Sequence, residues 1–158
     1  MLQLFLAGGY IEYGEAVKKA GLDEKYLNNL KWGLYYILAA DQGGYVVATI
    51  GKDGLAHISW GSPEVYLRKM KLATGLDERP YDTTKVSSIL PLSAAVLASG
   101  YLIFKEANYL THAKSLYEAV DSTRSNDGQG IDKSYYPDTD FYDELFSAAN
   151  WMYMAGYG

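Results

Sequence analysis

The sequence predicts an all-α fold, an incomplete double layer of about five helices with one long loop that carries short strands. Apolar residues recur at helical spacing in five segments, and short links join neighbouring segments into antiparallel pairs. One of these helices is apolar on nearly all sides and the next is amphipathic, which indicates an inner and an outer layer. Five helices would leave such a double layer open at its edges.

The first two helices are predicted for residues 2–20 and from residue 23 onward. Gly21 suits the end of the first, because glycine adopts the left-handed conformation at little cost. Asp23 can cap the second. The apolar stripe of this second helix is Leu27, Leu30, Leu34, Ile37 and Leu38.

Residues 41 to 86 are predicted to form the long loop. Only residues 45–50 read as extended, and glycines and prolines punctuate the remainder. A loop of this length inside a compact domain is usually functional. The punctuating residues are Gly43, Gly44, Gly51, Gly54, Gly61, Pro63, Gly75 and Pro80.

The helical period returns in three further segments. Residues 88–104 have almost no polar face, so this helix must be covered on most sides, and Pro91 fits only within its first turn. Residues 107–123 carry charges opposite their apolar stripe and predict an outer helix. A second loop over 125–139 precedes the last predicted helix, 141–155.

Composition narrows the classes of function. Of 158 residues, 49% are apolar and 21% charged, which suffices for one core. A formal charge of −5 argues against nucleic acid and anionic membranes as partners. No cysteine is present, so disulfides and thiolate metal sites are excluded. The 16 tyrosines suit stacking on sugars, and they also suit partly solvated helix faces.

His57 and Trp60 are the first candidate site residues, because both lie in the long glycine-rich loop. A large aromatic side chain and a histidine in an irregular surface segment fit a ligand cleft. Alternatively, Trp60 fixes the loop to the helices and His57 bonds a backbone carbonyl. His112 lies on the predicted outer helix and is expected to be structural.

A second candidate is the segment 135–144, which concentrates aromatic residues and carboxylates just before the last helix. Its carboxylates either complement the helix dipole or supply oxygen ligands to calcium. The sequence has no P-loop, G-x-G-x-x-G, H-E-x-x-H or G-x-S-x-G motif, and no pair of carboxylates suited to acid–base catalysis stands out.

The segment from Gly51 to Glu64, with His57-Ile58-Ser59-Trp60-Gly61-Ser62-Pro63-Glu64 at its end, resembles a signature of glycoside hydrolase family 9. These are mostly endo-acting β-1,4-glucanases, and the signature reads G-x-G-x-x-D-H-x-x-W-G-R-P-E. The likeness is collinear over nearly the whole chain, with the short spacing of animal members near its end. Further matching segments are 10–15, 29–36, 79–81, 94–105, 112–117 and 136–153.

The resemblance implies part of an (α/α)6 barrel, with the chain 1–158 as a single incomplete domain from the middle of the catalytic domain. It implies a cleft for a β-1,4-glucan or cello-oligosaccharide, and inverting hydrolysis by two carboxylates with a water between them. The family's base, in a D-A-G-D motif, and its acid Glu fall outside the matched stretch, so we expect this chain to be inactive. No cofactor is expected for the chemistry, and the parent protein is expected to be secreted.

The resemblance also assigns residues to the site. His57, Trp60 and Tyr136 match substrate contacts, with Trp60 in the cleft wall. Asp143 and Glu144 match carboxylate ligands of a structural calcium, and Thr139 and Asp140 are expected to add carbonyl oxygens.

The chain departs from the family pattern at four positions. The alternative to a glucanase is therefore a non-catalytic carbohydrate-binding or helical scaffold module built on the same fold. Ala56 stands where the signature has Asp, and Ser62 where it has Arg. The other departures are Leu92 in place of a Glu and Ser147 in place of an indole.

Overall fold

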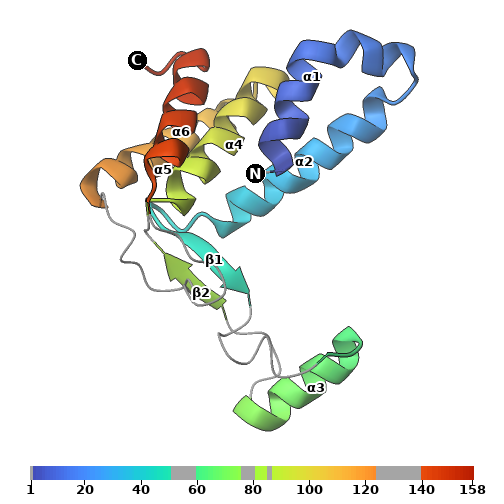
Figure 1. Cartoon of the computed structure of the whole chain (residues 1–158), viewed down its shortest axis with the longest axis vertical. Helices are drawn as coiled ribbons and strands as arrows, with labels where there is room; N and C mark the ends of the chain where they lie inside the picture. The colour runs from blue at the N-terminus through green and yellow to red at the C-terminus, as the bar shows by residue number, and fades with distance from the viewer. Residues whose placement is uncertain (1, 51–59, 76–80, 85–86, 124–139) are drawn as a thin grey trace.

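The computed structural model describes residues 2–50, 60–75, 81–84, 87–123 and 140–158. Within these ranges the chain forms six helices and a two-stranded antiparallel sheet (Figure 1). The helices are α1 (Leu2–Lys19), α2 (Asp23–Ala40), α3 (Pro63–Thr74), α4 (Ile89–Phe104), α5 (Ala107–Thr123) and α6 (Tyr142–Met154), and the strands are β1 (Val46–Ile50) and β2 (Tyr81–Thr84). No helix in the described ranges is both long and apolar enough to cross a membrane.

The five predicted helices are confirmed as α1, α2, α4, α5 and α6, each within a residue or two of its expected bounds. Gly21 has the expected positive φ, 70°, after the end of α1. The expected cap at Asp23 is wrong, because Leu22 takes the capping position. Asp23 lies in the first turn of α2 and accepts a hydrogen bond of 2.6 Å from the Tyr10 hydroxyl on α1.

α3 and β2 are not among the predicted elements, and both lie inside the predicted long loop. Pro63 and Gly75 were interpreted as loop punctuation, but they are the first residue and the left-handed C-terminal cap of α3. β2 pairs with β1 in the register Val46↔Thr84 and Ile50↔Tyr81, with an irregularity between Val47 and Thr49. The long loop is therefore a hairpin that carries a helix.

Helix α4 forms the centre of the core. It lies between the α1–α2 pair and the α5–α6 pair, and it packs against all four helices (Figure 1). Because nearly every side of α4 is apolar, this arrangement removes its surface from water. Its fully buried side chains are Leu90, Ala94, Ala95, Leu97 and Ala98, and α5 contributes Tyr109, Ala113, Leu116 and Val120 to the same core.

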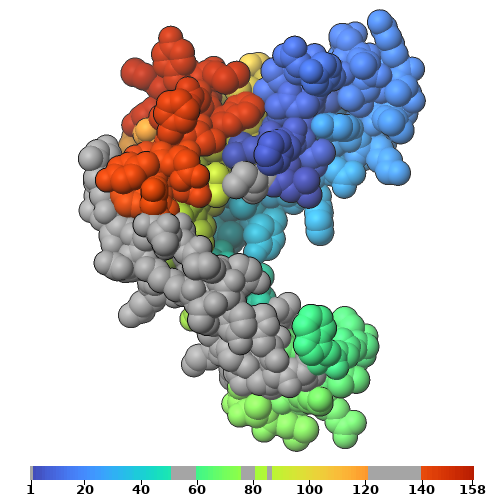
Figure 2. All heavy atoms as spheres, in the orientation of Figure 1, coloured from blue at the N-terminus to red at the C-terminus, as the bar shows by residue number. Residues whose placement is uncertain are grey.

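Three helices, α1, α2 and α6, carry strongly exposed aromatic side chains. Phe5 on α1, Trp32 on α2, and Phe146 and Tyr153 on α6 are each more than 70% exposed. Figure 2 shows α1 and α6 at the same surface of the molecule. These exposed faces agree with the predicted incomplete double layer.

Gly100 allows α2 and α4 to approach closely. A Cβ atom at this position would lie 2.5 Å from Cδ2 and 2.8 Å from Cδ1 of Leu34, whose side chain is 2% exposed. Leu34 is enclosed by the core and has little room to move aside.

We expect Gly100→Ala to lower the free energy of unfolding by about 1–3 kcal/mol through overpacking, despite the higher helix propensity of alanine. Gly8→Ala on α1 is the matched control, because its Cβ would meet only the Trp151 ring at 3.9 Å. Urea unfolding of both variants measures the difference. Equal stability of the two variants would contradict the close approach.

Tyr109 packs against Phe104 in this core, with ring centroids 6.3 Å apart, and is 1% exposed. Burial raises the pKa of Tyr109 to about 12, because the phenolate cannot be solvated there. In the unfolded chain the same pKa is about 10. The stability that Tyr109 contributes is therefore complete below pH 10 and is lost as the pH rises through 12.

We expect the free energy of unfolding to fall by on the order of 2 kcal/mol between pH 10 and pH 12 from this residue alone. Tyr109→Phe should lack this part of the decline, whereas Tyr153→Phe, at an exposed position, should retain it. Urea unfolding at several alkaline pH values tests the expectation. An identical decline in both variants would refute it.

Candidate functional site

Trp60 is the candidate substrate residue that the structure describes. It lies three residues before the start of α3, and its relative exposure is 96%. The alternative that Trp60 fixes the loop to the helices is therefore wrong. An indole that touches so little of the protein is available to stack on a ligand.

The turn after Trp60 is held by local interactions at the start of α3. Ser62 takes the capping position with extended backbone, and Pro63 occupies the first helical position. A hydrogen bond from the Ser62 hydroxyl lowers the pKa of Glu64 below its usual value, and the backbone N–H of Glu64 adds to this effect. The negative charge of Glu64 complements the helix N-terminus.

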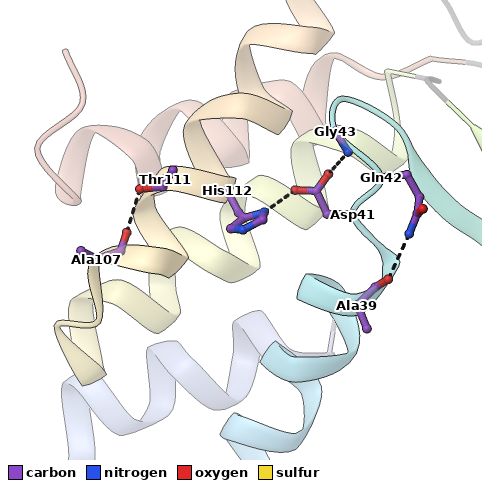
Figure 3. A network of polar contacts seen from close by, with 7 residues as sticks. All are labelled: Ala39, Asp41, Gln42, Gly43, Ala107, Thr111 and His112. Atoms are coloured by element: carbon purple, nitrogen blue, oxygen red, sulfur yellow. Dashed lines mark hydrogen bonds and ion pairs between the residues drawn. The ribbon is translucent and has the colours of Figure 1, made fainter.

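Asp41 and His112 connect the origin of the hairpin to the helical body. Asp41 follows the last residue of α2, and its Oδ2 lies 2.6 Å from Nδ1 of His112 on α5 (Figure 3). Oδ1 of Asp41 accepts a hydrogen bond of 2.9 Å from the Gly43 backbone N–H. The Asp41 side chain is 2% exposed, so the pair replaces most of its hydration.

This contact lies beside the turn that precedes β1. Gln42 N–H donates to the Tyr45 carbonyl at 2.8 Å, and Asp41 forms an isolated bridge with Val46. The turn needs positive φ at Gly43 and Gly44, 76° and 91°. The expected structural role of His112 agrees with this geometry. The sequence analysis missed Asp41, although an Asp between a helix end and two glycines is a recognisable turn signal.

The three candidate calcium ligands lie at the start of α6. Oδ1 of Asp140 accepts a hydrogen bond of 2.9 Å from the Tyr142 backbone N–H, and Asp143 and Glu144 occupy the first turn. These positions agree with the interpretation that the carboxylates complement the helix dipole. Among the described residues, no three metal-ligating side chains gather closely enough to hold an ion. The calcium site stays a prediction.

Two other candidate residues, His57 and Tyr136, lie outside the described residues, as do Ala56 and Thr139. Their convergence with Trp60 on one cleft stays a prediction. The structure therefore describes one aromatic element of the candidate site and the helix that follows it.

We expect Asp41→Ala to lower the free energy of unfolding by about 2–3 kcal/mol, because it leaves the Gly43 N–H without its acceptor and His112 without its partner. Asp140→Ala is the matched control, since that exposed carboxylate also accepts a backbone N–H; it should lose no more than about 1 kcal/mol. A double-mutant cycle with His112→Ala isolates the side-chain pair. A coupling energy near zero would contradict the role assigned to it.

Comparison with known proteins identifies relatives over nearly the whole chain. Residues 3–158 match the profile of Glycosyl hydrolase family 9. The chain is 30% identical to Endoglucanase 2 of Arabidopsis thaliana over 159 residues, which cover 95% of this chain and 30% of the plant protein. It is 32% identical to Endoglucanase A of Bacillus pumilus over 160 residues, covering 95% of this chain and 24% of the bacterial protein.

Solved structures show the same arrangement of helices. Endoglucanase CelQ from Clostridium thermocellum, complexed with cellotriose, matches with a TM-score of 0.83 and 35% identity, covering 97% of this chain and 24% of CelQ. The endoglucanase of the termite Nasutitermes takasagoensis matches with a TM-score of 0.79 and 26% identity, covering 97% and 36%. The chain thus spans between 24% and 36% of the length of these four relatives. It belongs to glycosyl hydrolase family 9, and its helices form part of that family's (α/α)6 barrel.

Proposed function

We propose that this chain is part of an inverting endo-β-1,4-glucanase and that it supplies a wall of the glucan-binding cleft. The observation that carries the proposal is the exposed indole of Trp60, in a chain whose family match extends over residues 3–158. The similar CelQ structures contain cellotriose and cellotetraose, which are β-1,4-glucan fragments. The ligand class proposed here is the same.

In the proposed binding mode, the face of the Trp60 indole packs against the apolar face of a sugar ring. His57 and Tyr136, by their match to the family, contribute polar contacts to neighbouring hydroxyl groups. A flat apolar surface beside a few polar groups is the usual composition of a small-molecule site.

We further propose that this chain binds glucan without cleaving it. Inverting hydrolysis needs a protonated carboxylic acid and a second carboxylate that activates water. The sequence contains no D-A-G-D motif, which holds the base in the family. Glu64 is the carboxylate that follows Trp60 most closely, and it is exposed, without the burial that raises the pKa of a catalytic acid.

A non-catalytic binding module is the second candidate function, and Ser62 favours it. Ser62 stands where the family signature has Arg, so a neutral hydroxyl replaces the guanidinium that the signature places beside the tryptophan. Hydrolysis by the complete parent protein would decide for the enzyme, and sugar binding without hydrolysis would decide for the module.

Two further expectations accompany the proposal. The parent protein is secreted, since an insoluble polymer must be met outside the cell. A structural calcium binds near the start of α6 through the carboxylates of Asp143 and Glu144 and the carbonyl oxygen of Asp140, because oxygen ligands suit a hard cation.

We expect the chain to bind cellohexaose, and Trp60→Ala to weaken the affinity by about five-fold or more through the loss of ring stacking. Trp32→Ala is the matched control, because Trp32 is also largely exposed, 78%, but lies on α2. Isothermal titration calorimetry measures both affinities. Unchanged binding by Trp60→Ala, or an equal loss in Trp32→Ala, would refute the assignment.

The same preparation tests whether catalysis is absent. We expect no new reducing ends after prolonged incubation with cellohexaose. Cleavage would show that catalytic carboxylates lie on this chain and would overturn that part of the proposal.

A further inference from the structure

Helix α3 concentrates positive charge in an acidic chain. Arg68, Lys69 and Lys71 are three of four consecutive residues, and Glu64 is the acidic residue of the same helix. The chain as a whole has 19 acidic and 14 basic residues. The charge of α3 therefore differs in sign from that of the molecule.

The geometry of α3 places these cations in solvent. Met70 is the buried residue of the helix, and at 3.6 residues per turn Arg68 lies on the opposite face, with Lys69 and Lys71 on the two flanks. All three are exposed. Figure 1 shows α3 apart from the other described helices.

Helix stability accounts for only one of the three cations. Lys71 lies in the last turn, where a positive charge complements the helix C-terminus. Arg68 and Lys69 lie before that turn, and within the described part of the chain neither makes an ion pair or a side-chain hydrogen bond. Their charges are available to a ligand.

These charges lie close to Trp60 along the chain. Gly61 and Ser62 separate the indole from the start of α3, and Arg68 is five positions after Pro63. At the rise of an α-helix this is about 8 Å along the axis. A glycan stacked on Trp60 and extending along α3 would reach Arg68 within a few sugar units.

We propose that α3 extends the glucan-binding face and that Arg68 and Lys69 bind carboxylate groups on a β-1,4-linked chain bearing uronate or other carboxyl substituents. The guanidinium of Arg68 can bind a carboxylate with two parallel hydrogen bonds, and Lys69 adds a point charge. Glu64 repels carboxylates at the start of the helix, so the anionic substituents bind beside its second half. This proposal rests on the proposed function, because Trp60 holds the chain that presents the carboxylates.

An acidic protein segment, including the surface of a second copy of this chain, would also be attracted to these cations. The adjacent exposed indole and the carbohydrate-active family favour the glycan. Self-association therefore enters the test as an outcome that counts against the proposal.

The test compares two ligands of matched length, cellohexaose and cellohexaose with glucose units oxidised at C6 to glucuronate. We expect the 158-residue chain to bind the oxidised ligand about five-fold more tightly at low ionic strength, and the advantage to shrink as salt is added. Arg68→Gln/Lys69→Gln should remove the advantage, so that the two ligands bind with equal affinity. Arg68→Glu/Lys69→Glu should make the oxidised ligand the weaker one.

The control variant is Lys19→Gln/Lys25→Gln, which removes the same charge from the α1–α2 end of the molecule, far from α3 in Figure 1. It should keep the full preference. Equal affinity of the unmodified chain for both ligands would overturn the inference while leaving the proposed function intact. Absence of cellohexaose binding would instead refute the proposed function.

Two further results would also overturn the inference. The first is a preference that falls equally in the control variant, since net charge alone would then explain it. The second is concentration-dependent association, measured by sedimentation, that Arg68→Glu/Lys69→Glu abolishes while no preference for carboxylates is found. That result would assign the basic face to a second copy of the chain.

Discussion

The requirement to cover α4 determines the rest of the structure. This helix has almost no polar face, so its placement is favourable only where other helices exclude water from it. Small side chains at Ala94, Ala95 and Ala98, and the bare backbone at Gly100, let those helices approach closely. Four helices, α1, α2, α5 and α6, pack around α4. This arrangement gives the chain one shared hydrophobic core, although it spans only part of the length of its relatives.

The candidate site is joined to that core by one polar contact and by Val46 of β1, whose side chain is buried in the core. Asp41 ends α2 and contacts His112 on α5, and β1 starts from the turn that this pair stabilises. The hairpin, α3 and Trp60 follow along the chain, and among their described residues it is β1 that contacts α2 and α4. A polar contact suits this junction because hydrogen-bond geometry is directional. Apolar packing alone would define less well the direction in which the hairpin leaves the helical body.

Local signals predicted the helical layers well, because each helix buries one stripe and so repeats apolar residues at its own period. They failed for α3, whose one buried side chain is Met70 and whose flanking Pro63 and Gly75 resemble loop residues. They could not pair Asp41 with His112, because 71 positions separate the two in sequence. The exposure of Trp60 was equally unpredictable, since residue type does not reveal whether an indole packs inward or faces solvent.

The cations of α3 offer a replacement for the arginine that this chain lacks at position 62. The family signature places an arginine there, beside the tryptophan, whereas this chain has Ser62. The charged side chain nearest to it in the turn is Glu64, which is negative. Positive charge returns at Arg68 and Lys69, which the helical rise places about 9 Å further along. Stacking of a sugar on Trp60 needs no charge, so the loss of the arginine does not remove it. The choice between neutral and charged ligands depends on where the cations lie. The shift of positive charge from position 62 to Arg68 and Lys69 therefore favours a changed ligand preference over a loss of ligand binding.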